Sequence, residues 1–227
     1  IIRCEPNLLH NAPGTPLLLA RWLPSTYCIA MKVSDIPKTF PQSDARILLS
    51  CVLKKPGEFF IAHPDFIVDE EATRDFSALA EKRERGVPLA YITNHREFFG
   101  LDFYVDERVL IPRPETELLV ESVIQMVNSA SAEARGRSGQ VTILDVGTGS
   151  GCIAISLAKH LPDTNIIAVD ISTGALEVAK KNAATHEVQK RITFRKSDLL
   201  SEVHESADII VANLPYIGTR ETNLVSK

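Results

Sequence analysis

The sequence of 227 residues contains few cysteines, and none of them form a pair with the spacing of a zinc or redox motif. Cys4, Cys28, Cys51 and Cys152 lie far apart, whereas metal-binding and redox cysteines usually stand two or three residues from a partner. We therefore expect no metal site and a reducing, cytoplasmic setting. Cys152 follows a glycine loop and is interpreted as a small packing residue rather than a nucleophile.

Long apolar runs and an excess of positive charge are also lacking. No stretch reaches the about 18–20 apolar residues that a helix needs to cross a bilayer. The net charge is −4 and the pI is about 5.9, whereas indiscriminate nucleic-acid binding requires a basic surface. We expect neither a membrane nor a nucleic acid as a direct partner. Hydrophobic residues make up 44% of the chain, which is enough for a sizeable core.

The first residues allow two interpretations. Residues 1–30 contain two arginines, one acid and the apolar run PLLLARWL, which is compatible with part of a targeting segment and an organellar location. Alternatively, Met31 is a natural start and the residues before it are unrelated upstream sequence. The second interpretation is preferred, and residues 1–42 are treated as an extension without an assigned role.

Residues 43–86 are expected to form a small helical domain. The segment SDARILLSCVL predicts a helix capped by Ser43 or Asp44, and DEEATRDFSALAEKRERG predicts a second helix that ends before Gly86. Residues 87–111 are rich in β-branched and aromatic side chains and predict a β-hairpin linker that turns at Gly100. The segment RPETELLVESVIQMV then predicts a helix with a proline in its first turn.

From Val141 onward, short apolar segments alternate with helical ones. The expected strands are VTILDVG, NIIAVDIS, RITFRKSDLL and ADIIVAN, and the expected helices are GCIAISLAKHL and GALEVAKKNAATH. This alternation is typical of a parallel sheet with helices on both faces. The sequence therefore predicts an α/β domain over residues 112–227, with a Rossmann-like sheet.

The loop LDVGTGSG follows the first of these strands and opens a helix. Its three glycines permit a tight turn and a close approach of a ligand, which in such sheets binds at the carboxyl ends of the strands. The phosphate-loop pattern GxxxxGK[ST] is missing from the sequence. A dinucleotide is disfavoured because Cys152 occupies the last fingerprint position and the carboxylate of Asp145 would repel a pyrophosphate.

Acidic residues follow the other strands. Asp170 ends the second strand, where a carboxylate can accept hydrogen bonds from ribose hydroxyls. Asp198 follows the third strand, where it could accept from an adenine amino group, with Leu199 beside the ring. Asp145 could pair with the ammonium group of an amino acid. An ammonium, a ribose and an adenine together describe S-adenosylmethionine. Each residue alone is as well explained by a turn or a helix cap, but their placement at the ends of successive strands favours a ligand site.

The glycine loop and these acids resemble the class I S-adenosylmethionine-dependent methyltransferases. NLPY, Asn213–Tyr216, resembles the (D/N)PPY motif of the amino-group methyltransferases in that class. Residues 86–121 (GVPLAYITNHREFFGLDFYVDERVLIPRPETELLVE) and SDARILL resemble the HemK/PrmC family, protein-(glutamine N5) methyltransferases of peptide chain release factors. The resemblance implies S-adenosylmethionine as cofactor, a release factor as partner of the helical domain, and RPETE near the site.

The resemblance also implies which residues form the site. Those expected to contact the cofactor are Asp145, Gly147, Thr148, Gly149, Ser150, Gly151, Asp170, Asp198, Leu199 and Asn213. Those expected to hold the substrate glutamine are Asn213, Leu214, Pro215 and Tyr216. The Asn213 side-chain oxygen and the Leu214 carbonyl would each accept one amide hydrogen, and the ring of Tyr216 would face the amide.

Two departures from the family pattern leave alternatives open. Leu214 stands where the family usually has proline, which removes rigidity worth about 0.4–1 kcal/mol. The family sheet has seven strands in the order 3-2-1-4-5-7-6, and only the first four are predicted here. The hypothesis is a C-terminally truncated chain of uncertain activity. The alternatives are an adenine-N6 nucleic-acid methyltransferase and an inactive module that binds the cofactor or the release factor; a dinucleotide-dependent oxidoreductase is disfavoured.

Overall fold

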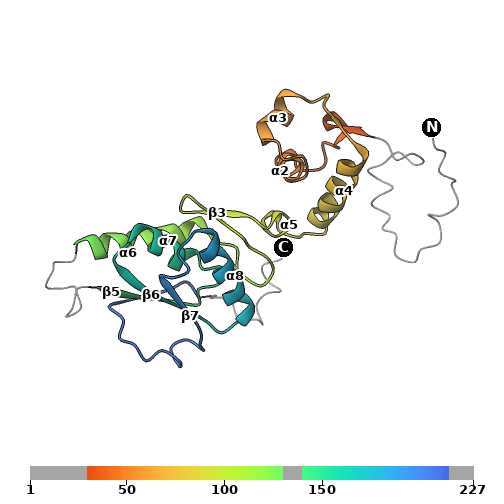
Figure 1. Ribbon diagram of the computed structural model, residues 1–227. Coiled ribbons are helices and arrows are strands. Elements are labelled where there is room, and N and C mark those ends of the chain that lie inside the picture. The colour runs from red at the N-terminus through yellow and green to blue at the C-terminus, as the bar shows by residue number, and fades with distance from the viewer. Residues whose placement is uncertain (1–29, 130–139, 215–227) are drawn as a thin grey trace, which may run out of the picture. The chain divides into compact units, whose positions relative to one another are not determined.

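The computed structural model describes residues 30–129 and 140–214 (Figure 1). The chain divides into two compact units, residues 1–93 and residues 94–227, and each is considered by itself. Within the two described ranges, no helix combines the length and the hydropathy that crossing a lipid bilayer would require.

The first unit is mainly helical. Its two longer helices are α2 (Gln42–Leu53) and α4 (Glu70–Glu84). The short elements are β1 (Met31–Lys32), η1 (Val33–Asp35), α3 (Gly57–Ala62), β2 (Ile67–Val68) and α5 (Leu89–Thr93), and β1 pairs antiparallel with β2. The helical domain that the sequence predicts is therefore present, with a small two-stranded ribbon added to it.

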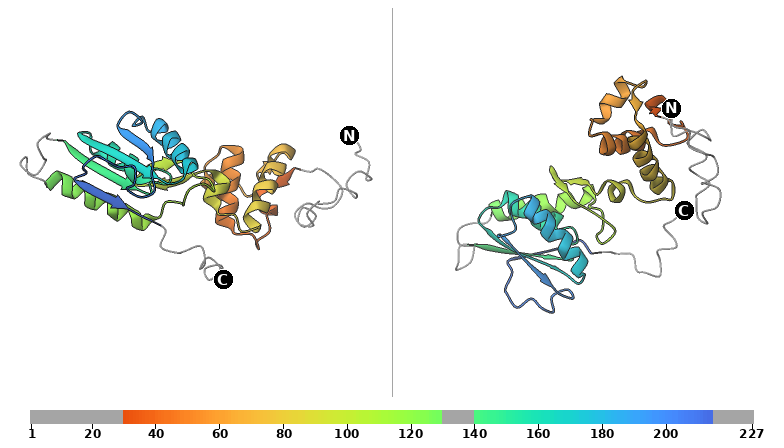
Figure 2. Two further views of the ribbon diagram at one scale, coloured as in Figure 1. Left: turned by 90° about the horizontal axis from the view of Figure 1, so that it is seen from below. Right: turned by 45° about the vertical axis from the view of Figure 1, so that its right-hand side comes forward.

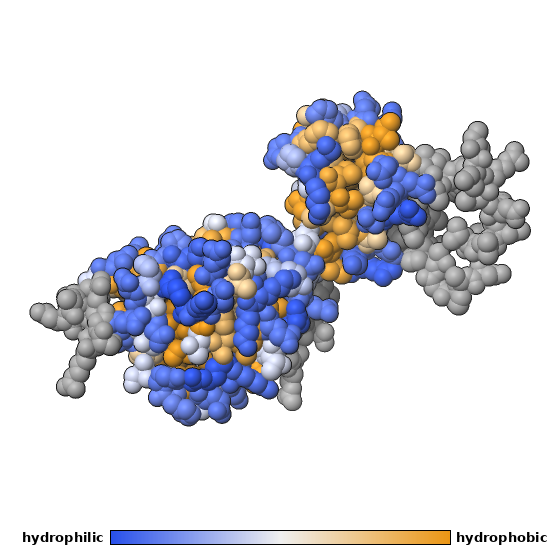
Figure 3. Space-filling model, viewed as in Figure 1, coloured by the Kyte–Doolittle hydropathy of each residue, from blue (hydrophilic) through white to orange (hydrophobic). Residues whose placement is uncertain are grey.

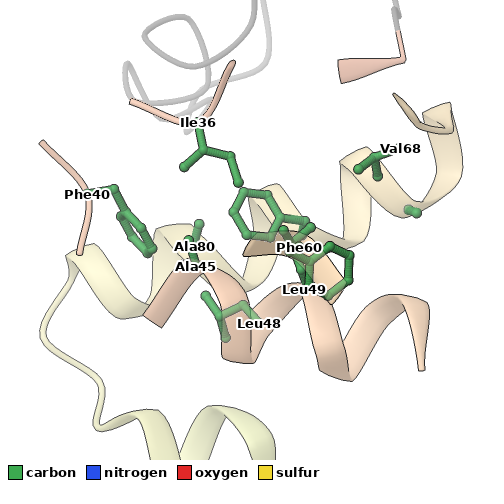
Figure 4. Close-up of a cluster of buried hydrophobic side chains, with 10 residues drawn as sticks. Ile36, Phe40, Ala45, Leu48, Leu49, Phe60, Val68 and Ala80 are labelled. Carbon is green, nitrogen blue, oxygen red and sulfur yellow. The ribbon is translucent and has the colours of Figure 1, made fainter. Parts of the chain in front are cut away.

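One apolar cluster holds this unit together (Figure 4). The buried members are Ile36, Phe40, Ala45, Leu48, Leu49, Phe60, Val68, Ala72, Phe76 and Ala80. Residues at helical spacing on α2 face those of α4, so each helix buries one stripe and exposes the other. At the edge of this core, the Arg83 guanidinium donates to the Asp44 carboxylate over 2.7 Å.

The predicted start of α2 is wrong in its detail. The helix begins at Gln42, directly after Pro41, and neither Ser43 nor Asp44 caps it. Asp44 instead lies in the first turn and accepts the hydrogen bond from Arg83 of α4. The Asp44 carboxylate therefore binds a neighbouring helix instead of capping its own helix, as the local pattern had predicted.

The predicted β-structure over residues 87–111 is also partly wrong. Residues Leu89–Thr93 form helix α5, and only β3 (Arg96–Phe98) and β4 (Leu101–Phe103) form the hairpin. The carbonyl of Pro88 accepts from the backbone of Tyr91 and Ile92, which starts the helical turn. Leu89 and Ile92 lie three residues apart and pack on the core of the first unit, so burial outweighs the β propensity of this segment.

The second unit is built on a four-stranded parallel sheet (Figures 1 and 2). Its strands are β5 (Val141–Val146), β6 (Thr164–Asp170), β7 (Ile192–Lys196) and β8 (Ile209–Ala212), and their order is β7-β6-β5-β8. This is the order 3-2-1-4 when the strands are counted along the chain. The predicted Rossmann-like class I sheet is confirmed for these four strands.

The helices of this unit are α6 (Glu117–Ser129), α7 (Cys152–His160) and α8 (Thr173–Thr185), and α6 is preceded by the 3-10 turn η2 (Pro114–Thr116). All three lie on one side of the sheet in Figure 1, so within residues 94–129 and 140–214 only one of the two faces that the sequence predicts to be covered carries helices. The opposite face, with Leu144 and Ile167, packs against Val203 and Ala207 of the β7–β8 connection.

The strand order gives the physical reason for this difference. Parallel crossover connections are right-handed, so two successive crossovers in one direction place their helices on the same face. The path from β5 through β6 to β7 runs in one direction and carries α7 and α8. The path from β7 back to β8 reverses this direction and passes over the other face.

Candidate active site

A cavity of about 240 Å³ opens at the carboxyl ends of β5, β6 and β8. Its lining residues are Arg108, Val109, Leu110, Val146, Gly147, Gly149, Asp170, Ile171, Ser172, Ala175, Ser197, Asp198, Leu199, Asn213 and Leu214. β5 and β8 are parallel neighbours, but the connection after β5 leads to one side of the sheet and β8 is added on the other. The connections that follow these two strands therefore separate, which leaves a crevice at this edge. The fold therefore creates the cavity where the sequence predicts a ligand.

Seven of the predicted site residues line this cavity. They are Gly147, Gly149, Asp170, Asp198, Leu199, Asn213 and Leu214. Four others, Asp145, Thr148, Ser150 and Gly151, belong to the glycine loop but are not among the lining residues. Pro215 and Tyr216 lie outside the described residues. The tertiary structure thus brings the ends of four strands to one cavity. Within the glycine loop, Gly147 and Gly149 line this cavity, and the other predicted residues lie behind it.

Gly151 illustrates a supporting position. Its φ is +81°, and a Cβ atom there would stand 3.1 Å from the Cβ of Ala179 on α8 and 3.0 Å from Cδ1 of Ile155. Glycine is thus required both by the left-handed backbone and by the close approach of the loop to α8. This accounts for Gly151 without a ligand contact.

Asp170 connects the glycine loop to the end of β6. Its Oδ2 accepts from the backbone nitrogen of Gly149 over 2.9 Å, and its Oδ1 accepts from that of Ser172 over 2.9 Å. A carboxylate oxygen can accept two hydrogen bonds, so each oxygen keeps capacity for a further donor. Asp170 therefore shapes the loop and still offers an acceptor to the cavity that it lines.

Asp145 is completely buried behind the loop. Its Oδ2 accepts from Oγ1 of Thr148 over 2.6 Å and from the backbone nitrogen of Ala154 over 3.3 Å. Its Oδ1 has no hydrogen-bond partner among residues 30–129 and 140–214. Burial raises the pKa of this carboxyl to about 6, although the hydrogen bond from Thr148 opposes the shift. A contact of Asp145 with the ammonium group of a ligand stays a prediction.

Asn213, directly after β8, is joined to a segment nearly a hundred positions earlier in the chain. Its side-chain nitrogen Nδ2 donates to Oγ1 of Thr116 over 2.8 Å. Thr116 ends the 3-10 turn η2 in the RPETE segment and is 8% exposed. Thr116 of the RPETE segment therefore lies against Asn213, whereas the sequence pattern assigned no role to its side chain.

Leu214 covers part of the glycine loop. A Cβ atom at Gly147, where φ is +71°, would stand 2.5 Å from Cδ2 of Leu214. The leucine side chain thus occupies the space that the missing Cβ of Gly147 leaves. It remains 40% exposed and lines the cavity.

The segment Arg108–Leu110 also lines the cavity, and the sequence pattern did not assign it to the site. Arg108 donates to Asp106 over 2.7 Å and to Glu177 of α8 over 2.9 Å. The guanidinium holds the pKa of the Asp106 carboxyl down, at about 2. The acids Asp106 and Glu107 beside Arg108 in VDERVLIP could have indicated an ion pair. The contact of Arg108 with Glu177 of α8 depends on the tertiary structure.

Cys152 is the first residue of α7. Cys152 is buried, and burial raises the pKa of its thiol to about 12, so the thiol is protonated at neutral pH and supports packing rather than nucleophilic attack. The residues that the structure describes include no group of three or more histidine, cysteine, aspartate or glutamate side chains placed to hold a metal ion.

Two family models match the chain. The first, described as the PrmC N-terminal domain, matches residues 36–93, and the second, the methyltransferase small domain, matches residues 118–226. The release factor glutamine methyltransferase of Koribacter versatilis is 43% identical over 201 residues, which cover 87% of this chain and 67% of that protein. The chain belongs to the release factor glutamine methyltransferase family.

Other relatives support the same family. The release factor glutamine methyltransferase of Chlorobaculum tepidum is 40% identical over 187 residues, covering 80% of this methyltransferase and 62% of that protein. The bifunctional methyltransferase of Rickettsia conorii is 37% identical over 207 residues, covering 84% of this chain but 40% of that protein. The chain thus spans about two thirds of the length of these two release factor glutamine methyltransferases and less than half of the bifunctional methyltransferase.

Family membership and fold together indicate the cofactor. The strand order is that of a class I methyltransferase sheet, and the match to the methyltransferase small domain includes the whole of that sheet. The cofactor of this methyltransferase is S-adenosylmethionine.

Proposed function

We propose that this methyltransferase transfers a methyl group to the side-chain amide nitrogen of the glutamine in the Gly-Gly-Gln motif of peptide chain release factors. The observation that carries the proposal is the position of Asn213. It lies at the carboxyl end of β8 and lines the same cavity as the glycine loop and Asp170. A neutral amide at this position can receive the hydrogens of another amide.

The lining of the cavity suits S-adenosylmethionine. Gly149 has no side chain, and only the Gly147 carbonyl oxygen lies within 4.0 Å of where its Cβ would stand, so the loop backbone there is open to a ligand. In the proposal the Asp170 carboxylate accepts from the ribose hydroxyls, and Asp198 accepts from the adenine amino group. The side chain of Leu199, which is 54% exposed, offers an apolar surface to the adenine ring. When bound, the cofactor supplies an electrophilic methyl group.

The protein's task is to position a weak nucleophile. The lone pair of an amide nitrogen is delocalised into the carbonyl group, so the nitrogen reacts poorly unless it is aligned. We propose that Oδ1 of Asn213 and the backbone carbonyl of Leu214 each accept one hydrogen of the substrate amide. Two acceptors fix the orientation of the NH₂ group and increase the electron density at nitrogen. Asn213 is neutral and does not take the proton, so the amide nitrogen loses it to water after the new C–N bond forms and the C–S bond of the methyl donor breaks.

Leu214 provides this chemistry without the stiffness of proline. The acceptor that the proposal requires is a backbone carbonyl, which every residue carries. A proline at this position would restrict the conformations of its own backbone and of the preceding residue, an effect worth about 0.4–1 kcal/mol. We therefore expect leucine to reduce the rate severalfold at most. Pro215 and Tyr216 are proposed to contact the substrate amide, and both lie outside the described residues.

The first unit is proposed to bind the release factor and to place this methyltransferase in translation termination in the cytoplasm. Figure 3 shows apolar side chains gathered on one face of this unit. Its exposed large hydrophobic residues include Ile47, Ile61 and Ile67, of which the last two are 63% exposed. Apolar side chains that gather on a small surface often mark a protein-binding site.

The test is a transfer assay with a release factor and S-adenosylmethionine that carries a labelled methyl group. Label should enter the wild-type release factor and should be lost when the glutamine of its Gly-Gly-Gln motif is replaced by alanine. Equal label in both release factors would refute the glutamine assignment. Cofactor binding without any transfer would favour a non-catalytic binding module. Transfer to DNA or RNA, with binding that weakens steeply as salt increases, would favour an adenine methyltransferase instead.

A further inference from the structure

We infer that Thr116 is a positioning residue that sets the orientation of the Asn213 carboxamide, so that Oδ1 rather than Nδ2 faces the cavity. The hydroxyl of Thr116 accepts from Nδ2 of Asn213 over 2.8 Å. Asn213 lines the cavity, whereas Thr116 is not among the lining residues. The nitrogen is therefore held on the side of η2, and the oxygen is left for the cavity.

A carboxamide needs such a restraint because its two ends have opposite chemistry. The oxygen only accepts hydrogen bonds and the nitrogen only donates them, yet a rotation of 180° exchanges two groups of nearly the same size. Among residues 30–129 and 140–214, the hydrogen bond to Thr116 is the one that the Asn213 side chain makes. A freely rotating side chain would present a donor to the substrate's own N–H groups for part of the time.

Thr116 is itself held in place. Its backbone nitrogen donates to the carbonyl of Arg113 over 3.0 Å within η2, and the turn starts with Pro114, whose φ is restricted. The next residue, Glu117, begins α6 and accepts from the backbone nitrogen of Phe99 in the hairpin turn over 3.0 Å. A β-branched side chain has few rotamers, so a buried threonine on this anchored turn presents its hydroxyl in a defined direction.

This inference rests on the proposed function, in which Oδ1 of Asn213 accepts a hydrogen of the substrate amide. Thr116 would act through Asn213 and would not contact the reacting atoms. Through Thr116, the RPETE segment would help to form the site that binds the substrate amide, although this segment precedes the sheet in the chain. A loss of the hydroxyl should therefore affect turnover more than cofactor binding.

Two substitutions separate the hydroxyl from the volume of the side chain. Thr116→Val keeps the branched shape and removes the acceptor, whereas Thr116→Ser keeps the acceptor. The spectroscopic readout is the NH₂ signal of the Asn213 side chain in a ¹⁵N correlation spectrum, assigned by its loss in Asn213→Asp. We expect its hydrogen exchange to be about tenfold faster in Thr116→Val and near wild type in Thr116→Ser. Equal exchange in all three proteins would overturn the inference.

The kinetic readout uses the release-factor transfer assay. We expect kcat to fall by about tenfold to a hundredfold in Thr116→Val, with the Kd for S-adenosylmethionine within about twofold of wild type, and to recover in Thr116→Ser. An unchanged kcat in Thr116→Val would overturn the inference while leaving the proposed function intact. If wild type shows the protected NH₂ but methylates no release factor, the orientation stands and the proposed function fails. If Thr116→Val does not fold, Thr116→Ala replaces it in both measurements.

Discussion

The side chain of Asn182 pairs with the backbone of Tyr104 in both directions. The Tyr104 nitrogen donates to Oδ1 over 2.8 Å, and Nδ2 donates to the Tyr104 carbonyl over 3.0 Å. The same Nδ2 donates to the carbonyl of Ser150 in the glycine loop over 2.9 Å. Asn182 is 1% exposed, so one buried amide on α8 holds together the end of the hairpin and the loop that shapes the cavity.

We expect Asn182→Ala to lower the free energy of unfolding by about 2–4 kcal/mol, because three backbone groups lose a partner and a buried side chain is removed. Urea denaturation would measure this change. The matched control is Asn165→Ala at the one exposed position of β6, which should stay within about 0.5 kcal/mol of wild type. A loss below 1 kcal/mol at Asn182, similar to that of the control, would show that the three hydrogen bonds are dispensable.

Gly151→Ala should destabilise the second unit by about 2–3 kcal/mol, because the left-handed backbone and the contact with Ala179 on α8 both oppose a Cβ atom. The control is Gly100→Ala, where φ is +71° and nothing lies within 4 Å of the added Cβ. This control isolates the backbone cost, so it should lose only about 1–2 kcal/mol. Thermal unfolding of both variants gives the comparison. Equal losses would mean that the packing of the loop on α8 does not require glycine.

Asp170→Ala should weaken the binding of S-adenosylmethionine by about tenfold to a hundredfold. A hydrogen bond to a charged group contributes about 1.5–3 kcal/mol, and 1.4 kcal/mol corresponds to a factor of ten. The loss would include the support that Asp170 gives to Gly149. Calorimetric titration of the cofactor measures the effect, and Asp163→Ala, at an exposed position, serves as control. If both variants bind like wild type, Asp170 is not part of the cofactor site.

Asp145 should make stability depend on pH in mildly acidic solution. Its carboxyl has a reference pKa of 3.8 and burial raises this value to about 6 in the folded protein. Between these two values the folded state keeps a proton that the unfolded state has released. This residue therefore makes the free energy of unfolding fall as pH rises from about 4 to about 6, and its effect is constant above that range.

The comparison of wild type with Asp145→Asn tests this pH dependence. Asparagine can accept from Thr148 through its oxygen and carries no charge, so its contribution should not change with pH. We expect the stability of the variant relative to wild type to increase between pH 4 and pH 6, as measured by denaturation at a series of pH values. Parallel profiles for the two proteins would be evidence that the buried carboxyl does not titrate in this range.

Local patterns were sufficient for much of the fold. The alternation of apolar strands and amphipathic helices from Val141 onward predicted β5 to β8 with α7 and α8, because periodicity follows from which side chains are buried. The strand ends at Gly147, Asp170 and Asn213 were predicted to meet, and all three line the cavity. Parallel strands place their carboxyl ends at one edge of the sheet. The residues that directly follow successive strands in the sequence are therefore predicted to lie close together.

Other features depend on contacts between distant residues, which no local pattern contains. Leu89–Thr93 is helical because Leu89 and Ile92 pack on the core of the first unit, and α7 and α8 share one face because the chain reverses direction only after β7. Thr116 meets Asn213 across 97 positions, and Gly151 is needed for the approach of α8. Local patterns in the sequence predict the strands of the sheet, the helices α7 and α8 and the residues at the strand ends, because alternation and helical spacing follow from burial. The tertiary structure decided which of these residues line the cavity and which hold it in shape, because packing assigns each side chain its neighbours.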